Sequence, residues 1–268
     1  MQSKVVMKQT IKIFKVGGKV IEQPELLKAF LKDFASLPQP KVLVHGGGRS
    51  ATAMAEKLGV ETKMVEGRRV TDQAMLDIVL MVYGGLNKKI VAQLQAEKCN
   101  AIGLTGADLN AMQAHKRPPQ PVDYGLVGDI DAVNAEGLIG LLDQGIVPVM
   151  APLTHDGKGQ MLNTNADNIA GSVARALAQH QPVELFYCFE KKGVMKDPDD
   201  DSSLIPMITA EDFDRLKAEG IVVEGMIPKL ENAFKTLDAG VEKVCIMHYE
   251  KIHGVGGDEF EGTTLCLR

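Results

Sequence analysis

The sequence predicts a three-layer α/β/α sandwich, in which helices cover both faces of a mainly parallel central sheet. Two observations predict this fold class. Short apolar segments alternate with amphipathic segments along the whole chain, and strands that alternate with helices are normally parallel. Two of the apolar segments also run directly into glycines that precede a helix, an arrangement typical of the carboxyl ends of strands in open α/β sheets.

Each element follows from a local pattern. Strands are expected where short apolar runs are bounded by polar residues, at 11–16, 41–45, 101–104, 146–150, 183–189, 241–247 and 264–267. Helices are expected where apolar residues recur every three or four positions, at 24–35, 50–58, 71–98, 167–177, 210–218 and 228–239. Thr209 with Asp212 three residues later predicts a helix cap. The Pro-rich segment 116–125 and the acidic segment 196–203 have loop compositions.

Composition limits the possible partners and location. The chain has 268 residues and a net charge of −5, with no long basic run, so neither nucleic acid nor an anionic membrane surface is an expected partner. The four cysteines are scattered, as expected for thiols in a reducing compartment. Neither a signal peptide nor a membrane span is recognisable. We therefore expect a cytoplasmic protein with a single domain, whose lobes span about 1–180 and 181–268.

The glycine clusters are the first candidates for a site. Gly17 and Gly18 follow the first predicted strand, and 46–48 follow the second. Such turns are either simple strand-to-helix connections or anion sites, because helix N-termini present free N–H groups. The motifs GxxxxGK[ST], GxGxxG and GxSxG are absent, which argues against a Walker-type loop, a dinucleotide fold and a serine hydrolase.

Two lysines favour the anion site. Lys15 directly precedes the first glycine cluster, and Lys229 lies in the first turn of a predicted helix. A cation in a first turn opposes the helix dipole, so an anion between the dipole and Lys229 would explain its position. Asn163, Asn165 and Asp167 alternate at the entry of another helix, where they serve either as caps or as donors and a carboxylate that orients a lysine.

Taken together, these motifs resemble the amino-acid kinase family. The resemblance extends from about residue 11 to the C-terminus and rests on KVGG, LVHGGG, EGRRVTD, GLTGAD, DYGLVGDIDAVN, LNTNAD and GMIPK in this order. Within the family the chain is similar to members that phosphorylate an acylated glutamate in the second step of arginine biosynthesis. The resemblance implies that ATP, as its Mg²⁺ complex, transfers a phosphoryl group to the side-chain carboxylate of N-acetyl-L-glutamate.

The resemblance also implies roles for the residues around the transferred group. Lys15 would bridge the transferring phosphoryl group, Lys229 would stabilise the leaving side of ATP, and Asp167 would hold both lysines. The backbone N–H groups of Gly47 and Gly48 would contact the phosphoryl oxygens and the attacking carboxylate.

Substrate recognition is assigned in the same way. From the residues alone, Arg68 and Arg69 are equal candidates to bind a carboxylate. The resemblance selects Arg69 for the α-carboxylate and Asn163 for the acyl-amino part.

The nucleotide would lie on the C-terminal half. The positions implied are Gly18, Glu190, Gly193, Val222 and Val223. The family usually carries an Asp-Val-x-Gly-type turn after the strand at 183–189, where this chain has a Glu at 190. No protein side chains are expected to form a dedicated metal site.

Three alternatives remain open, and one assembly is predicted. The alternatives are a different acyl group such as succinyl, another reaction of the same family, and a non-catalytic sensor. Gly84 and Gly85 lie in the middle of the long helix predicted at 72–98, where glycine costs about 1 kcal/mol relative to alanine. Adjacent glycines allow another backbone to approach closely, so we expect this helix to form the interface of a homodimer.

Overall fold

The computed structural model describes residues 9–197, 200–222, 226–257 and 260–267. Val223, one of the predicted nucleotide contacts, lies outside these ranges. Among the described residues, eight strands form the main sheet, in the order β12-β14-β13-β11-β1-β2-β8-β5. They are β1 (Ile11–Val16), β2 (Lys41–His45), β5 (Ala101–Leu104), β8 (Val147–Met150), β11 (Val183–Phe189), β12 (Met207–Thr209), β13 (Lys243–His248) and β14 (Thr263–Cys266).

The pairing within this sheet is mainly parallel. β1 pairs in parallel with both β2 and β11, and only β13 and β14 are antiparallel neighbours within the part that is described. The fold class predicted from the alternation of elements is therefore confirmed. The glycine turns at 17–18 and 46–48 follow β1 and β2, and the turn at 190–193 follows β11. These three strands are adjacent and parallel, so the three turns lie together at one edge of the sheet.

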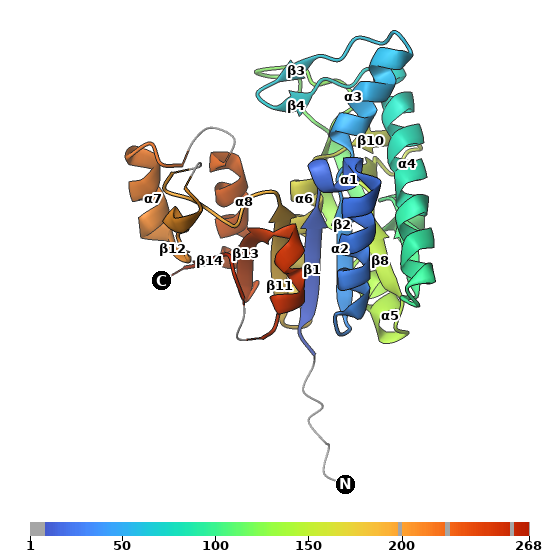
Figure 1. Cartoon of the computed structure of the whole chain (residues 1–268). Coiled ribbons are helices and arrows are strands. Elements are labelled where there is room, and N and C mark those ends of the chain that lie inside the picture. The colour runs from blue at the N-terminus through green and yellow to red at the C-terminus, as the bar shows by residue number, and fades with distance from the viewer. Residues whose placement is uncertain (1–8, 198–199, 223–225, 258–259, 268) are drawn as a thin grey trace.

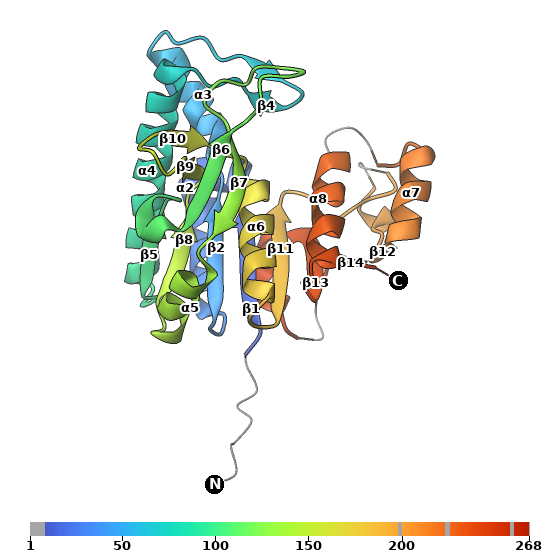
Figure 2. The same ribbon diagram turned by 180° about the vertical axis from the view of Figure 1, so that it is seen from behind.

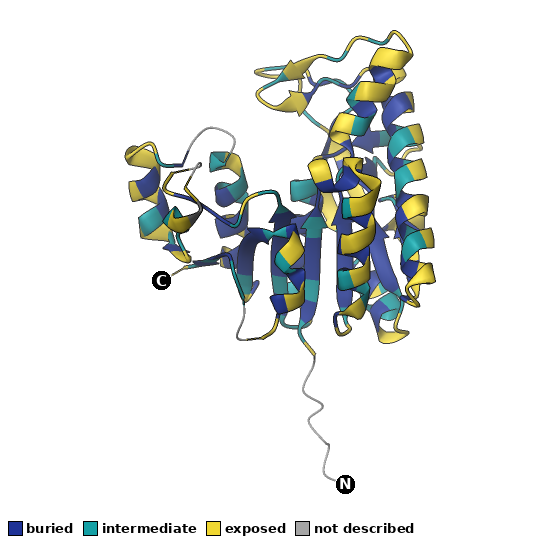
Figure 3. Ribbon diagram, viewed as in Figure 1, coloured by how far each residue is buried: buried dark blue, intermediate teal, exposed yellow. Residues whose placement is uncertain are grey.

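Helices cover both faces. The helices are α1 (Lys19–Glu22), α2 (Pro24–Ser36), α3 (Gly48–Lys57), α4 (Gln73–Ala96), α5 (Ala135–Asp143), α6 (Ala166–Ala178), α7 (Ala210–Ala218) and α8 (Ile227–Asp238). Figure 1 shows α1, α2 and α4 in front of the sheet, and Figure 2 shows α5, α6 and α8 on the opposite face. In Figure 3 the central strands are buried, whereas the outer faces of the helices are exposed.

Apolar packing fixes both faces of the central strands. On the α2 face, Phe14 of β1 stacks on Phe186 of β11 with ring centroids 5.0 Å apart and meets Phe34 of α2 edge-on at 5.5 Å. On the other face, Ile13 and Leu185 are fully buried in the cluster that includes the α6 residues. Lys15, next to the last residue of β1, thus belongs to a strand that is packed on both faces.

A second, smaller sheet packs partly over the main sheet, and Figure 2 shows its strands β6 and β7 on the same side as α5 and α6. Its order is β10-β9-β6-β7, and the sequence analysis did not anticipate it. The strands are β6 (Met112–Lys116), β7 (Gly128–Val133), β9 (Leu153–His155) and β10 (Met161–Asn163), with a separate hairpin of β3 (Met64–Val65) and β4 (Arg68–Arg69). In Figures 1 and 2 the hairpin lies at the end of the molecule toward which β1 points.

Candidate active site

The two glycine turns lie side by side. Gly46 donates its N–H to the carbonyl of Val16 at 2.9 Å, and a Cβ on Gly46 would come within 3.4 Å of the Gly17 Cα. The backbones of the two turns therefore pack directly against each other at Gly46, whereas a Cβ on Gly17 would lie 2.9 Å from Lys15 Nζ.

Gly47 and Gly48 differ in what surrounds them. Gly47 has a φ of +155°, and a Cβ there would lie 2.9 Å from the Tyr83 ring of α4. The packing of Tyr83 therefore excludes a Cβ at Gly47 whether or not an anion binds there. Gly48 begins α3, and a Cβ there would meet nothing within 4 Å.

Asp167 holds Lys15 and Lys229 at one point. Its Oδ1 lies 2.9 Å from Lys15 Nζ, and its Oδ2 lies 2.8 Å from Lys229 Nζ. Asn165 caps α6 by accepting from the backbone N–H of Asp167 at 2.8 Å, which fixes the carboxylate in the first turn. Asn232 donates to the Asp167 carbonyl at 3.1 Å. Three segments that are far apart in sequence are thus joined.

The electrostatics of this cluster favour an ionised carboxylate. Burial alone would raise the pKa of Asp167, but the charges and hydrogen bonds of Lys15 and Lys229 more than offset it, so its pKa lies well below its ordinary value. The cluster therefore carries two positive charges and one negative charge. Its net positive charge suits an anion, as a phosphoryl-transfer site requires.

A cavity of about 300 Å³ opens at this edge of the sheet. Of the predicted site residues, it is lined by Lys15, Gly18, Gly47, Gly48, Arg69 and Asn163. Its other charged lining residues are Glu22, Arg49, Arg68 and Arg117. The cavity is therefore strongly cationic, and the structure brings most of the predicted substrate residues together around it.

Arg69 is held by an internal network. It is 8% exposed, and its Nη2 donates to the Gly48 carbonyl at 2.8 Å and to Thr52 Oγ1 at 2.7 Å. Its Nη1 donates to Thr62 Oγ1 at 3.3 Å. Binding a carboxylate through both terminal nitrogens would require Arg69 to exchange some of these bonds, so its predicted role stays a prediction.

Asn163 is also ordered by the protein. It ends β10, is 8% exposed, and donates from Nδ2 to Thr71 Oγ1 at 3.0 Å. That bond leaves its Oδ1, which has no recorded bond among the described residues, as the atom suited to accept a substrate N–H.

The predicted nucleotide residues have structural roles of their own. Glu190 Oε1 accepts from the backbone N–H of Lys19 at 2.6 Å, and a Cβ on Gly18 would lie 2.6 Å from that oxygen. A Cβ on Gly193 would lie 2.5 Å from Thr263 Oγ1, and Val222 is 3% exposed within the core. Their contacts with a nucleotide stay predictions.

The sequence analysis missed several residues that shape the site. His45 is buried, with its Nδ1 2.7 Å from the Gly46 carbonyl and its Nε2 3.1 Å from Asn87 Nδ2, and burial lowers its pKa to about 4. Arg117 lines the cavity but lies beside prolines that indicated only a loop. The available signal for His45 was its position as the last residue of a predicted strand, directly before three glycines.

The fold and the site define an α/β protein with a cationic cavity, suited to anionic small molecules, at the carboxyl ends of its central strands. The sequence model of the amino acid kinase family matches residues 10–248. The chain belongs to that family. No helix among the described residues has both the length and the apolar character needed to cross a membrane.

Relatives and solved structures agree with this placement. The chain is 60% identical to an acetylglutamate kinase of Phocaeicola vulgatus, over 90% of this chain and 94% of that protein. It is 56% identical to an acetylglutamate kinase of Bacteroides fragilis, over 94% and 97%. Its fold matches N-acetylglutamate synthase from Neisseria gonorrhoeae with a TM-score of 0.82 at 21% identity, covering 98% of this chain but 60% of that one. Carbamate kinase from Giardia lamblia matches with a TM-score of 0.71 at 14% identity, over 98% and 99%.

Proposed function

We propose that the protein is an ATP-dependent kinase that phosphorylates the side-chain carboxylate of N-acetyl-L-glutamate in arginine biosynthesis. Membership of the amino acid kinase family and 60% identity to a protein named acetylglutamate kinase support this function. The observation that carries it in the structure is the Lys15–Asp167–Lys229 cluster beside the glycine turns.

The chemistry requires charge neutralisation more than proton transfer. A substrate carboxylate is already ionised at neutral pH, so its oxygen attacks the γ-phosphorus without a base. The new bond joins that oxygen to phosphorus, the bond from phosphorus to the β–γ bridging oxygen breaks, and ADP leaves with the electron pair. Bringing a carboxylate to a triphosphate is electrostatically uphill, and positioned cations and N–H donors lower that barrier.

The catalytic residues divide this task. Lys15 bridges the transferred phosphoryl group, Lys229 stabilises the charge that develops on ADP, and Asp167 sets the spacing of the two ammonium groups. The N–H groups of Gly47 and Gly48 bind the phosphoryl oxygens and the attacking carboxylate.

The substrate residues hold the rest of the acylated amino acid. Arg69 binds the α-carboxylate, and Asn163 contacts the acyl-amino part.

The nucleotide occupies the C-terminal half, about 181–268, and the amino acid occupies the N-terminal half, about 1–180. Gly18, Glu190, Gly193, Val222 and Val223 contribute to the nucleotide side. The described residues gather no group of three His, Cys, Asp or Glu side chains that could hold a metal. Mg²⁺ would enter on the phosphates of ATP and neutralise part of their charge.

The same proposal includes the assembly and the location. We propose a homodimer that forms through α4 and functions in the cytoplasm, with ATP and the acylated glutamate as its partners. The exposed side chain of Met81 and the open surface at Gly84 and Gly85 support this interface.

A direct test is the detection of acyl phosphate as a hydroxamate after incubation with ATP, Mg²⁺ and hydroxylamine. N-acetyl-L-glutamate should give the hydroxamate, whereas aspartate, glutamate and carbamate should not; UMP, which has no carboxylate, is tested by ADP release. Product from one of the latter substrates alone would indicate another reaction of the family. ATP binding without any product would indicate a sensor.

A further inference from the structure

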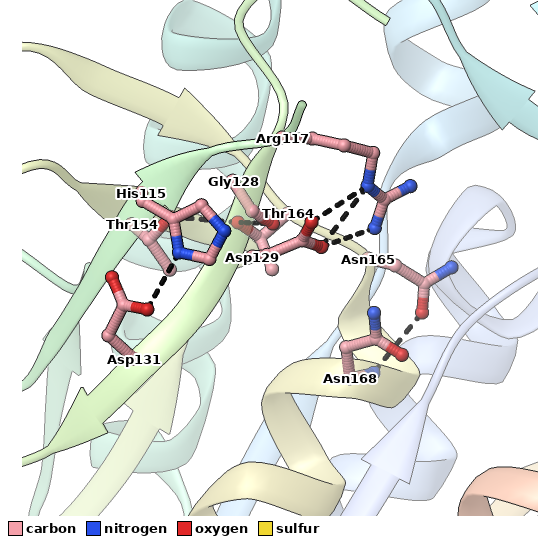
Figure 4. Close-up of polar contacts among 9 residues, drawn as sticks. All are labelled: His115, Arg117, Gly128, Asp129, Asp131, Thr154, Thr164, Asn165 and Asn168. Atoms are coloured by element: carbon pink, nitrogen blue, oxygen red, sulfur yellow. Dashed lines mark hydrogen bonds and ion pairs between the residues drawn. The ribbon is translucent and has the colours of Figure 1, made fainter. Parts of the chain in front are cut away.

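Arg117 is fixed in place by an ion pair with Asp129. Its Nε lies 3.1 and 3.0 Å from the two carboxylate oxygens, and its Nη2 lies 2.5 Å from one of them. Figure 4 shows this two-pronged contact between the end of β6 and the start of β7. The hydrogen bonds to Asp129, opposed by burial and assisted by its charge, raise the pKa of Arg117. Such a pair holds the guanidinium plane in one orientation.

The third nitrogen of this guanidinium is buried without a partner. Nη1 is buried and has no hydrogen-bond partner among the residues that the structure describes. The side chain as a whole is 14% exposed. In Figure 4 Nη1 projects from the side of the guanidinium that faces away from Asp129. A buried donor left unpaired costs about 1–3 kcal/mol, so Nη1 is suited to a ligand acceptor.

The backbone places Arg117 beside the residue proposed for the acyl-amino part. The N–H of Arg117 donates to the Val127 carbonyl at 2.8 Å, and Val127 forms a bridge with Asn163. All three residues line the cavity. Lys15 lines the same cavity from β1 of the main sheet, whereas Arg117 follows β6 of the second sheet. The residue proposed to act on the phosphoryl group and Arg117 therefore approach the cavity from different sheets.

We propose that Arg117 is a specificity-determining residue that donates from Nη1 to an oxygen on the N-acyl group of the substrate. This inference rests on the proposed function and deepens it. The acceptor is either the acyl carbonyl oxygen or, in a dicarboxylic acyl group such as succinyl, the terminal carboxylate. Both present an sp² oxygen to an N–H donor, and the carboxylate would form the stronger, charge-assisted bond.

The test compares Arg117→Met with a matched control on the same two strands. His115 pairs with Asp131 at 2.7 Å, and both side chains are about half exposed, so His115→Gln perturbs these strands without touching the cavity. We measure KM and kcat with N-acetyl-L-glutamate and N-succinyl-L-glutamate, and KM for ATP. Arg117→Met should raise KM at least tenfold for one or both of the acylated glutamates and leave KM for ATP unchanged. His115→Gln should change none of these KM values.

The two substrates identify the oxygen that is bound. An equal increase for both indicates the acyl carbonyl, and an increase for N-succinyl-L-glutamate alone indicates the terminal carboxylate. Unchanged KM values for both substrates would overturn the proposal. If Arg117→Met does not fold, Arg117→Lys is used instead. It keeps a positive charge beside Asp129 but replaces the three nitrogens of the guanidinium by one ammonium nitrogen, so the same increase in KM is expected.

Failure of the proposed function would be recognised separately. If the unmodified protein phosphorylates neither compound, the kinase assignment fails. The role of Arg117 is then decided by calorimetry, which measures the binding of both compounds to the unmodified protein and to Arg117→Met. Binding weakened by the substitution supports the proposal. Equal binding to both proteins, or no binding to the unmodified protein, refutes it.

Discussion

Replacing Lys229 with alanine should slow catalysis strongly while leaving the fold intact. Asp167 lies between two ammonium groups, at 2.9 Å from Lys15 and 2.8 Å from Lys229, so the variant retains a neutral Lys15–Asp167 pair. The loss of the contacts of Lys229 with the rings of Tyr187 and Phe189, at 5.3 and 5.5 Å, costs about 0.5–1 kcal/mol. The variant also leaves Asp167 Oδ2 without its partner at 2.8 Å, which costs about 1–3 kcal/mol. The free energy of unfolding should therefore fall by roughly 1.5–4 kcal/mol, the sum of these two losses.

The catalytic effect is measured on the folded variant and is separate from the effect on stability. Loss of one positioned donor that acts on charge developing in the transition state typically lowers kcat by about 10²–10³, or about 2.7–4 kcal/mol. Lys15→Ala should have a similar effect, and because both lysines act on one phosphoryl group, the double variant should lose less than the product of the two.

Asp167→Asn provides the contrasting case. Without the carboxylate charge, Lys15 and Lys229 become two cations no more than roughly 8 Å apart, which repel each other by about 2 kcal/mol at an effective dielectric constant of about 20. This variant should therefore be clearly less stable than Lys229→Ala, although it preserves the shape of the side chain.

The assay is kcat at saturating ATP and acylated glutamate, together with urea unfolding of each variant. If saturating ATP restores the rate of both lysine variants, the lysines only gather ATP. If kcat changes by only a few-fold, they are surface charges. Either result refutes the reasoning, as would an Asp167→Asn protein that is as stable as Lys229→Ala.

Three further predictions concern other parts of the molecule. Arg69→Lys keeps the charge but loses the planar fork, so KM for the acylated glutamate should rise at least about tenfold, or ~1.4 kcal/mol, with KM for ATP unchanged; an unchanged KM would transfer the role to Arg68 or elsewhere. Gly85→Arg should produce monomers in light scattering, whereas Gly140→Arg on α5, where a Cβ likewise meets nothing within 4 Å, should not; a dimer that persists in Gly85→Arg would argue against α4 as the interface. His45 is neutral in the folded protein down to pH about 4 but protonates near 6.5 when unfolded. Acidification from pH 7 to 5 should therefore lower the free energy of unfolding, and His45 alone should contribute about 2 kcal/mol of this loss. In His45→Gln that loss should be smaller by this amount, and an identical pH dependence of the two proteins would contradict it.

The central part of the fold was predictable because its patterns are local. The strands at 11–16, 41–45, 101–104 and 183–189 agree with the observed bounds, and Thr209 and Asp212 form the predicted capping box. Several helix ends differ by one or two residues, such as α3, which begins at Gly48 rather than at 50.

The second sheet was not predictable from such patterns. β9 and β10 have three residues each, too few for a periodic signal. β7 is half-buried to exposed after its buried Gly128 and contains two aspartates. β6 extends to Lys116, which the sequence predicted to lie in a loop. α5 has only nine residues and contains two glycines, so its buried face of Ala135, Leu138 and Leu142 gives a weak signal.

The candidate site was predictable only in part. Glycines after strands indicated an anion site from the residues alone, but the roles of Lys15, Asp167 and Lys229 came from the family resemblance. Nothing local specifies that residues so far apart in the chain meet. Arg117 gave no signal because its partner, Asp129, lies across a loop that had been interpreted only by its prolines.

The order of strands in the main sheet has a consequence for synthesis on the ribosome. β1 is made first among the main strands but lies between β2 and β11, so one of its neighbours is absent until β11 has emerged. Lys15 cannot meet Lys229 until roughly 10–40 s later, at translation rates of about 5–20 residues per second. Until β11 emerges, one edge of β1 has no strand to pair with, and unpaired edges promote aggregation. The Lys15–Asp167–Lys229 cluster is therefore assembled late, after β11 has been made but before β13 and β14 complete the sheet.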